Sequence, residues 1–260
     1  MLTGVLGFPV AHSRSPAMHN AAFAALGLDW RYVKLPVPAP LFEETVRGLP
    51  ASGYRGANVT IPHKLAALAL ADRASDVARA IGAANTLTFD DGIGAENTDA
   101  GGFLAALGES PRGMRALVLG AGGAARAVVW ALVDAGAADV AIWNRTPERA
   151  VELADAFGAR AVGAPEPADL VVNTTAVGLH GDDGLPLQTL AQPRLACDLV
   201  YRDGGETPFA AWAARADARV VDGLEVLVRQ GALSFRLWTG LEPPLDVMRA
   251  AARGEISLRT

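Results

Sequence analysis

Lysine is rare in this sequence, and one of its lysines stands among residues that could do chemistry. Of the 23 basic residues only Lys34 and Lys64 are lysines, and the rest are arginines. An arginine keeps its proton near neutral pH, whereas a lysine can give one up. Lys64 ends the polar segment NVTIPHK, which favours a role in proton transfer, with a solvated surface position as the alternative. For Lys34 we favour the solvated surface.

A glycine-rich turn lies near the middle of the chain, in the segment LVLGAGGAARAVV. It contains Gly120-x-Gly122-x-x-Ala125, directly after an expected strand and at the start of an expected helix. In this motif the first glycine permits a tight turn, the second lets the backbone approach a pyrophosphate, and Ala125 allows close helix–strand packing. The helix N-terminus offers unpaired N–H groups to the phosphates. The pattern predicts a dinucleotide site, with a plain glycine-rich turn as the alternative.

The residues after the next expected strand indicate which dinucleotide binds. An NAD site usually has Asp or Glu there, about 20 residues after the glycines, to bind the ribose 2′-hydroxyl. This chain has Asn144-Arg145-Thr146, and its first carboxylate there is Glu148. Arg145 would bind a 2′-phosphate that a carboxylate would repel, and Asn144 and Thr146 would add hydrogen bonds. The loop favours NADP over NAD, unless Arg145 is only a solvated loop residue.

Several short polar segments fall at or just after expected strand ends, where α/β folds place ligands. Together they predict a site for a small, hydroxyl-rich, anionic molecule. Each has a bland alternative: Ser15 and Asp99 could be helix caps, and Asn85 a turn residue. The segments are residues 12–15 (HSRS), 58–60 (NVT), 63–64 (HK), 85–86 (NT), 97–99 (NTD) and Gln230.

Composition restricts the class of protein. The chain has 260 residues, enough for one large or two modest domains, and 51% of them are hydrophobic. The net charge of −5 and the lack of a basic stripe argue against nucleic acid as a partner. No apolar run reaches the roughly 18 residues of a membrane span, and no signal peptide is expected. The single cysteine, Cys197, is expected to be buried and fits a cytoplasmic location. Metal binding finds no support, because His12, His19, His63 and His180 show no ligand spacing.

Short apolar runs alternate with helical patterns along most of the chain, which predicts an α/β fold with largely parallel sheets. Asp90-Asp91-Gly92 predicts a hairpin turn, and residues 108–113 (GESPRG) are the best linker candidate. Ser15 is expected to cap a helix that has Pro16 in its first turn. Expected strands are residues 3–7, 31–37, 56–61, 84–89, 93–95, 116–119, 139–143, 170–173, 196–200 and 219–221. Expected helices are residues 40–48, 99–107, 123–135, 147–157, 208–215 and 224–252, the last broken at Pro243-Pro244, together with helices starting at Ser15 and after Pro62.

Taken together, the polar segments resemble the shikimate dehydrogenase family, over almost the whole chain. The motifs that carry the resemblance are HSRSPAMHN, NVTIPHK, IGAANT, NTDA, GAGGAARA, NRT, NTTAVGL, DLVY and GLEVLVRQGALSF. The resemblance implies a two-domain α/β fold: an N-terminal substrate domain with a mainly parallel sheet, residues 1–107, and a Rossmann NADP domain, residues 108–226. Residues 227–260 would form helices that return to the first domain.

The resemblance also implies roles for individual residues. Lys64 would be the catalytic lysine, and Asp99 would hold it and an adjacent substrate hydroxyl in place. Ser13 and Ser15 would hold the substrate carboxylate. Residues expected to contact the ring hydroxyls and the reacting oxygen are Thr60, Asn85, Asp99 and Gln230, with Tyr201 lining the same cleft. Residues expected to contact the cofactor are Asp76, Gly120, Ala121, Gly122, Gly123, Ala124, Asn144, Arg145, Thr146, Pro147, Glu148, Arg149, Leu199 and Gly223.

The implied reaction is the reversible reduction of 3-dehydroshikimate to shikimate, a step of chorismate and aromatic amino-acid biosynthesis, with NADPH giving a hydride. Val226, Arg229 and Leu179 depart from the commonest family pattern, which affects packing at the nicotinamide more than proton transfer. Three alternatives stay open: an NAD-preferring quinate/shikimate dehydrogenase, a paralogue acting on an altered ring, and a catalytically silent NADP-binding sensor. A monomer or a homodimer is expected.

Overall fold

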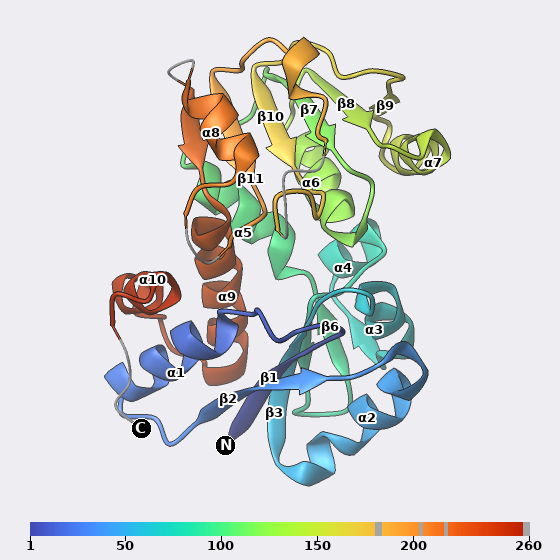
Figure 1. The fold of residues 1–260 in the computed structure, drawn as a ribbon. Coiled ribbons are helices and arrows are strands. Elements are labelled where there is room, and N and C mark those ends of the chain that lie inside the picture. Colours follow the sequence, from blue (N-terminus) through green and yellow to red (C-terminus); the bar gives the residue numbers. More distant parts are fainter. Residues whose placement is uncertain (180–183, 203–204, 216–217, 257–260) are drawn as a thin grey trace. The chain divides into compact units, whose positions relative to one another are not determined.

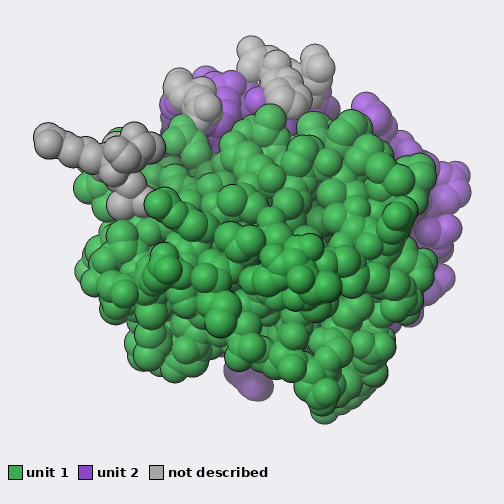
Figure 2. All heavy atoms as spheres, turned by 90° about the horizontal axis from the view of Figure 1, so that it is seen from below, with its two compact units in different colours: residues 1–102, 227–260 green, residues 103–226 purple. Residues whose placement is uncertain are grey.

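The computed structural model describes residues 1–179, 184–202, 205–215 and 218–256. The chain divides into two compact units, residues 1–102 with 227–260, and residues 103–226 (Figure 2). The divisions fall inside two helices, α5 (Thr98–Leu107) and α9 (Gly223–Thr239). The expected linker at residues 108–113 therefore lies within the second unit.

The first unit contains a six-stranded sheet in the order β2-β1-β3-β5-β6-β4. Its strands β1, β2, β3 and β6 are labelled in Figure 1. The β1–β2, β1–β3 and β4–β6 pairs are parallel, and the predicted hairpin of β5 and β6 makes the other two pairs antiparallel. The sheet is thus parallel-rich but mixed. Its strands are β1 (Leu2–Gly7), β2 (Arg31–Pro36), β3 (Tyr54–Val59), β4 (Arg73–Ala74), β5 (Thr86–Thr88) and β6 (Gly94–Glu96).

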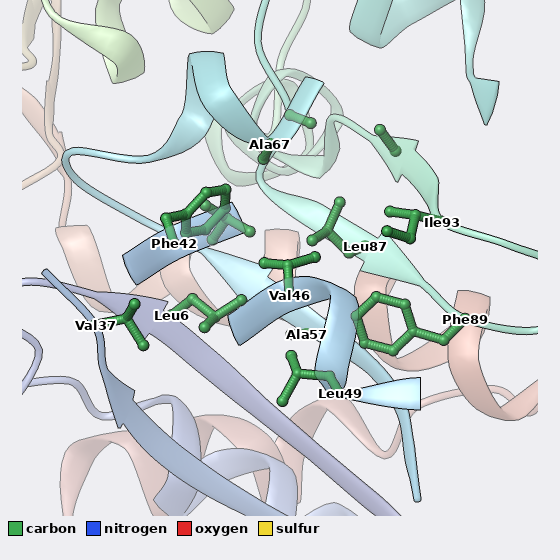
Figure 3. Packing of buried hydrophobic residues seen from close by; sticks show 13 residues of the cluster. Leu6, Val37, Phe42, Val46, Leu49, Ala57, Ala67, Leu87, Phe89 and Ile93 are labelled. Carbon is green, nitrogen blue, oxygen red and sulfur yellow. The ribbon is translucent and has the colours of Figure 1, made fainter. Parts of the chain in front are cut away.

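Helices cover this sheet through apolar side chains. In Figure 3, Phe42 and Val46 of α2 (Phe42–Gly48) pack with Leu6, Leu87 and Ile93 of the sheet region, all of them buried. Besides α5 and α9, the remaining helices of the unit are α1 (Ser15–Ala25), α3 (Lys64–Leu70), α4 (Asp76–Ile81) and α10 (Leu245–Arg253). Short 3₁₀ turns at Ala39–Leu41 and Pro50–Ser52 flank α2.

The second unit has a fully parallel sheet in the order β12-β11-β10-β7-β8-β9. The order reverses between β7 and β10, which is the doubly wound Rossmann arrangement, with its ligand edge at the carboxyl ends of the strands. The strands are β7 (Arg115–Leu119), β8 (Asp139–Trp143), β9 (Arg160–Ala161), β10 (Leu170–Asn173), β11 (Leu195–Asp198) and β12 (Arg219–Val221). Its helices are α6 (Gly123–Asp134), α7 (Pro147–Phe157) and α8 (Pro208–Ala214), with a 3₁₀ turn at Leu187–Thr189. The expected α/β fold class is confirmed.

One local expectation is wrong. Ser15 does not cap α1: it is the first helical residue, and Arg14 occupies the cap position without a side-chain bond to the helix. The hydroxyl that helps is that of Ser13, whose Oγ accepts a hydrogen bond from the backbone N–H of Ser15 at 3.3 Å. With Ser15 as the cap, the helix would begin at Pro16. It begins one residue earlier, at Ser15.

Two further expectations concern burial and membranes. Cys197 is a free thiol inside β11 with no exposed surface, as expected, and this burial raises the pKa of the thiol. Among the described residues, no helix combines the length and the apolar character that a bilayer span requires.

Candidate active site

Lys64 and Asp99 form an ion pair at the carboxyl end of the first sheet. Lys64 is the first residue of α3, shortly after β3, and Asp99 is the second residue of α5. The Nζ of Lys64 donates to the Oδ2 of Asp99 at 2.6 Å, and the two side chains are 12% and 21% exposed. The amine is therefore both held in one position and still reachable by a small molecule.

Asp99 is not a helix cap, which was the structural role that the sequence offered as the alternative to substrate binding. Asn97 takes that role, because its Oδ1 accepts from the backbone N–H of Asp99 at 3.1 Å and of Ala100 at 3.3 Å. The Asp99 carboxylate is consequently free to bond side chains. Its Oδ1 accepts from the Nδ2 of Asn85 at 2.8 Å, while its Oδ2 accepts from Lys64.

Asn85 and Gln230 extend this pair into a row of polar side chains. Asn85 is buried just before β5, and its Oδ1 accepts from the backbone N–H of Thr98 at 2.7 Å, so it is no surface turn residue. Its Nδ2 also donates to the Oε1 of Gln230 at 3.3 Å. The structure thus brings together four predicted residues from three helices and one strand end.

A glycine lets α5 and α9 approach closely enough for this arrangement. A Cβ atom added to Gly102 of α5 would lie 2.5 Å from the Cβ and 2.6 Å from the backbone nitrogen of Gln230. Real side-chain atoms do not approach this closely, so only glycine allows the two helix backbones to touch here. Gln230 is therefore positioned by a backbone contact.

Behind the row lies a buried cluster of small polar side chains that the sequence analysis did not single out as a group. Thr86 Oγ1 and Ser234 Oγ are 2.9 Å apart, and Asn58 Nδ2 donates to both, at 3.0 and 2.9 Å. Tyr32 closes the cluster by donating its hydroxyl to the Oδ1 of Asn58 at 2.8 Å. Because these buried polar groups are hydrogen-bonded to one another, their bonds offset the cost of desolvation and the cluster can rigidify the site.

The remaining predicted substrate residues of this unit lie in neighbouring loops. Ser13 and Ser15 stand where α1 begins, and Thr60 follows β3, with its backbone N–H donating to Leu6 at 2.8 Å. His63 is buried, stacks on Phe42 and has its Nε2 2.6 Å from the carbonyl oxygen of Val37. It is a structural neighbour of the site. In the described part of the chain, no group of three or more His, Cys, Asp or Glu side chains could hold a metal.

The glycine turn after β7 fits a dinucleotide. Gly120 has φ +110°, and a Cβ added to it would meet the Oγ1 of Thr174 at 2.6 Å, so the turn requires glycine. A Cβ added to Gly122 would meet nothing within 4 Å, which leaves its backbone open to a ligand. Gly122 caps α6 without a side-chain bond, so the first N–H groups of this helix face outward beside Gly123 and Ala124. Ala121 is half-buried within the turn, and Ala125 is fully buried against the sheet.

The loop after β8 presents the cation expected for a 2′-phosphate. Arg145 is exposed, and the Nδ2 of Asn144 donates to the backbone oxygen of Thr146 at 2.8 Å, which orders the loop. Thr146 precedes α7 without capping it, so the hydroxyl is not used by the helix. Pro147, Glu148 and Arg149 form the exposed first turn.

The segments after β11 and β12 hold the other cofactor candidates, Leu199 and Gly223. Leu199 donates its backbone N–H to Asn173 at 2.9 Å. A Cβ added to Gly223 would meet the carbonyl oxygen of Val200 at 2.6 Å. Tyr201 belongs to this unit and is half-buried. Asp198 and Asn173 are buried and hydrogen-bonded here, and the sequence analysis assigned them no role. Polar letters inside the apolar strands LVVN and LACD were the available signal.

The predicted cofactor residue Asp76 stands elsewhere, and three further residues are the ones that depart from the commonest family pattern. Asp76 begins α4 in the first unit, where its 99% exposed side chain pairs with Arg79 at 2.6 Å. Val226 is buried in α9, Arg229 is half-buried one turn later, and Leu179 donates its backbone N–H to Ala176 at 3.2 Å. His180 lies outside the described residues.

A proton-bearing amine at the end of one sheet and a dinucleotide turn at the end of another form the combination that nicotinamide-dependent dehydrogenases use. The fold and these two sites define that class. Within it, the chain belongs to the shikimate dehydrogenase family. Three family models match it: "Shikimate dehydrogenase substrate binding domain" over residues 5–87, "Shikimate / quinate 5-dehydrogenase" over residues 105–174, and "Shikimate 5'-dehydrogenase C-terminal domain" over residues 223–253.

Individual relatives match nearly the whole chain. The shikimate dehydrogenase (NADP(+)) of Methanothermobacter thermautotrophicus is 45% identical over 271 residues, which cover 97% of this chain and 95% of that protein. The structure of shikimate 5-dehydrogenase from Thermus thermophilus, in complex with NADP(H) and shikimate, has a TM-score of 0.89 at 44% identity, covering 98% and 100% of the two chains. The ligand-free 5-ketofructose reductase of Gluconobacter sp. strain CHM43 has a TM-score of 0.88 at 31% identity, covering 98% and 99%.

Proposed function

We propose that this protein catalyses the reversible, NADP-dependent reduction of 3-dehydroshikimate to shikimate, within chorismate and aromatic amino-acid biosynthesis. Relatives 45% identical over almost the whole chain are named shikimate dehydrogenase (NADP(+)), and one similar structure is a complex with NADP(H) and shikimate. The single observation that carries the proposal is the Lys64–Asp99 pair, whose amine is partly exposed and 2.6 Å from the carboxylate.

In this reaction Lys64 would supply the proton. Bound NADPH would supply a hydride, and negative charge would then develop on the substrate oxygen. The ammonium group of Lys64 donates a proton to that oxygen, and the neutral amine takes it back when shikimate is oxidised. Asp99 holds the amine in one direction and stabilises its charge, so that little reorganisation is needed at the moment of transfer.

The neighbouring side chains would bind and orient the ring. Asn85, Thr60 and Gln230 offer amide and hydroxyl groups to the ring hydroxyls, and Ser13 and Ser15 would hold the carboxylate near the start of α1. Tyr201 would also contact the substrate. Asn85 is already bonded to Asp99 and to Gln230, so both amides are oriented before a substrate arrives.

The cofactor proposal rests on Arg145. The exposed guanidinium, with Asn144, Thr146 and Arg149 beside it, would bind a 2′-phosphate, and Gly120 to Ala124 would hold the pyrophosphate. Pro147 and Glu148 would border the ribose, and Leu199 and Gly223 the nicotinamide. Asp76 remains the weakest member of the predicted cofactor set. We further propose a cytoplasmic protein that is a monomer or a homodimer.

One assay tests the activity and its closest rivals together. Absorbance at the nicotinamide band is followed with shikimate or quinate as substrate and with NADP or NAD as oxidised cofactor. We expect the largest kcat/KM with shikimate and NADP. Higher kcat/KM with NAD would favour a quinate/shikimate dehydrogenase of the other cofactor class. Cofactor binding without turnover of either substrate would favour a catalytically silent sensor.

A different cyclic or sugar ketone is the second candidate substrate. The similarity to a 5-ketofructose reductase supports it, because a 31% identical chain of the same fold has a different named activity. Reduction of 3-dehydroshikimate and of 5-ketofructose with NADPH, compared by kcat/KM, separates the two. Faster reduction of the sugar would overturn the shikimate proposal.

A further inference from the structure

Asp198 is a buried carboxylate at the ligand edge of the second sheet. It is the last residue of β11, and it is only 1% exposed. A buried charge is expensive unless other groups pair with it, and here burial raises the pKa of Asp198 to about 6. A core that needed only stability would not place an acid here, so the acid calls for another explanation.

Three groups from three segments donate hydrogen bonds to this carboxylate. The Nδ2 of Asn173 donates to Oδ1 at 2.9 Å, and the backbone N–H of Val200 donates to the same atom at 3.0 Å. The hydroxyl of Thr207 donates to Oδ2. Asp198 therefore joins the end of β10, the loop after β11 and the start of α8.

Two of these bonds involve residues that lead toward the edge where a dinucleotide binds. Asn173 Oδ1 accepts from the Oγ1 of Thr175 at 2.8 Å, and the Cβ position of Gly120 lies 3.2 Å from the backbone nitrogen of Thr175. On the other side, Val200 presents its carbonyl oxygen to Gly223. The carboxylate is thus linked through Asn173 to Thr175, which packs against the phosphate turn, and it bonds Val200, which packs against the first residue of α9.

The order of the strands tells which half of the dinucleotide lies there. The pyrophosphate belongs at the turn after β7, and Arg145 after β8 marks the adenosine side. The other half of the molecule must then extend over β10 and β11, on the far side of the point where the strand order reverses. These are the two strands whose ends Asp198 ties together.

We propose that Asp198 is a positioning residue for the nicotinamide half of the cofactor, acting through the loops at residues 173–177 and 199–201. The proposal rests on the proposed NADP-dependent function and deepens it. Asp198 touches no cofactor atom: it holds the backbone of Leu199 and Val200 and the side chain of Asn173 in the places that the nicotinamide needs.

The test compares two ligands that differ in the nicotinamide. Dissociation constants are measured for NADPH and for adenosine 2′,5′-bisphosphate, which has the adenosine side but no nicotinamide. In Asp198→Ala we expect NADPH to bind about tenfold more weakly, since charge-assisted bonds are lost, while the bisphosphate stays within about twofold. Asp198→Asn keeps an acceptor for Asn173 and Val200, so NADPH binding should recover to within about threefold of wild type.

A matched control comes from the amino ends of the strands of the same sheet. Asp169 precedes β10, and its Oδ2 accepts from the backbone N–H of Arg115 at 2.9 Å. Asp169→Ala removes a carboxylate that also accepts from a backbone N–H but is 42% exposed, and it should leave both dissociation constants within about twofold of wild type. Unchanged NADPH binding in Asp198→Ala would overturn the proposal. So would equal losses for both ligands, because a general loosening of the unit would explain them.

If Asp198→Ala does not fold, Thr207→Val provides the test. It removes one donor to Asp198 together with the cap of α8, in which the Oγ1 of Thr207 accepts from Ala210 at 3.1 Å. Ser75→Ala is its control, because Ser75 caps α4 by the same bond at 3.1 Å. Only Thr207→Val should weaken NADPH binding selectively, by about threefold or more; equal behaviour of the two variants contradicts the proposal. Both experiments measure binding, so they stay readable even if wild-type turnover of shikimate fails.

Discussion

The proposed proton transfer depends on a single lysine that pairs with a carboxylate. Lys64 and Asp99 are 35 residues apart in the sequence, yet their side chains meet at 2.6 Å. Both residues could be predicted from the sequence, because each stands in a polar segment of an otherwise apolar region. Their roles stay predictions until turnover is measured.

Lys64→Arg tests proton transfer while keeping the positive charge. Arginine does not release its proton near neutral pH, so kcat should fall by about 10²–10⁴-fold, with the KM for shikimate changed by less than about threefold. Steady-state kinetics in both directions measure this. Lys34→Arg, at the only other lysine, is the control and should retain wild-type kcat. A Lys64→Arg enzyme with more than about a tenth of wild-type kcat contradicts the assignment.

His19 makes stability dependent on pH. It is fully buried in α1, stacks on Tyr32 with ring centroids 4.4 Å apart, and both its ring nitrogens lack a hydrogen-bond partner within the described residues. Burial lowers its pKa from 6.5 to about 3. Between these two values the unfolded chain binds a proton that the folded chain does not, so the free energy of unfolding falls as the pH falls.

His19→Phe should remove that dependence. Its contribution in wild type is about 1.4 kcal/mol per pH unit below about pH 6.5, and phenylalanine has no proton to bind. The variant should also gain about 1–3 kcal/mol at pH 7.5, since two unpaired polar atoms leave the core. Urea unfolding at pH 7.5 and pH 5 measures both effects. Equal slopes with pH in the two proteins would contradict the explanation.

At the scale of elements, the sequence predicted most helices and strands because their apolar periods and caps are local. The strands 139–143 and 170–173 and the helix 147–157 have the expected bounds. The two-residue strands β4 and β9 were not predicted, since two residues show no period, and their pairing depends on neighbouring strands. The six-residue helix α4 was missed for the same reason of length. Ser15 was misplaced because a serine before proline can occupy either of two neighbouring positions.

The approach of α5 to α9 is an element-scale feature that can be tested. Gly102→Ala adds a methyl group where Gln230 backbone already lies 2.6 Å away, so the helices must move apart. We expect a loss of about 1–3 kcal/mol in the free energy of unfolding. We also expect the KM for shikimate to rise about tenfold, because Gln230 moves relative to Asn85.

Gly101→Ala is the matched control on the same helix. Its added methyl group would meet only the Cδ1 of Leu233 at 3.1 Å, which is the end of a flexible side chain. The variant should keep the wild-type KM and gain up to about 1 kcal/mol from better helix propensity. If both variants raise the KM equally, helix packing is not what positions Gln230.

At the scale of the whole molecule, the predicted ligand sites divide between the two units. Lys64, Asp99, Asn85 and Gln230 belong to the first unit, and the glycine turn and Arg145 belong to the second. Sequence motifs could assign these sites to regions of the chain. They could not show the exclusion of a methyl group at Gly102 or the carboxylate bonds of Asp198, because both depend on how separate segments pack in the folded chain.

Hydrogen exchange measured with each ligand separately should show this division. Shikimate alone should slow amide exchange in β5, α5 and the middle of α9 around Gln230, since bound ligand stabilises the local structure it contacts. NADPH alone should slow exchange in the turn from β7 into α6 and in the loop after β8. The free protein in each buffer is the reference. Protection of the second unit alone by shikimate would contradict the site described here.

The contact between Gly102 and Gln230 also has a consequence for how such a chain can change over time. The second unit occupies one uninterrupted stretch, residues 103–226. The chain leaves the first unit at Gly102 and returns to it a few residues before Gln230, and the backbones of these two residues touch. An inserted domain whose two ends lie so near each other can be lengthened, shortened or exchanged for another domain without disrupting the fold of the first unit. The first unit could thus keep its substrate specificity while the second, dinucleotide-binding unit was replaced.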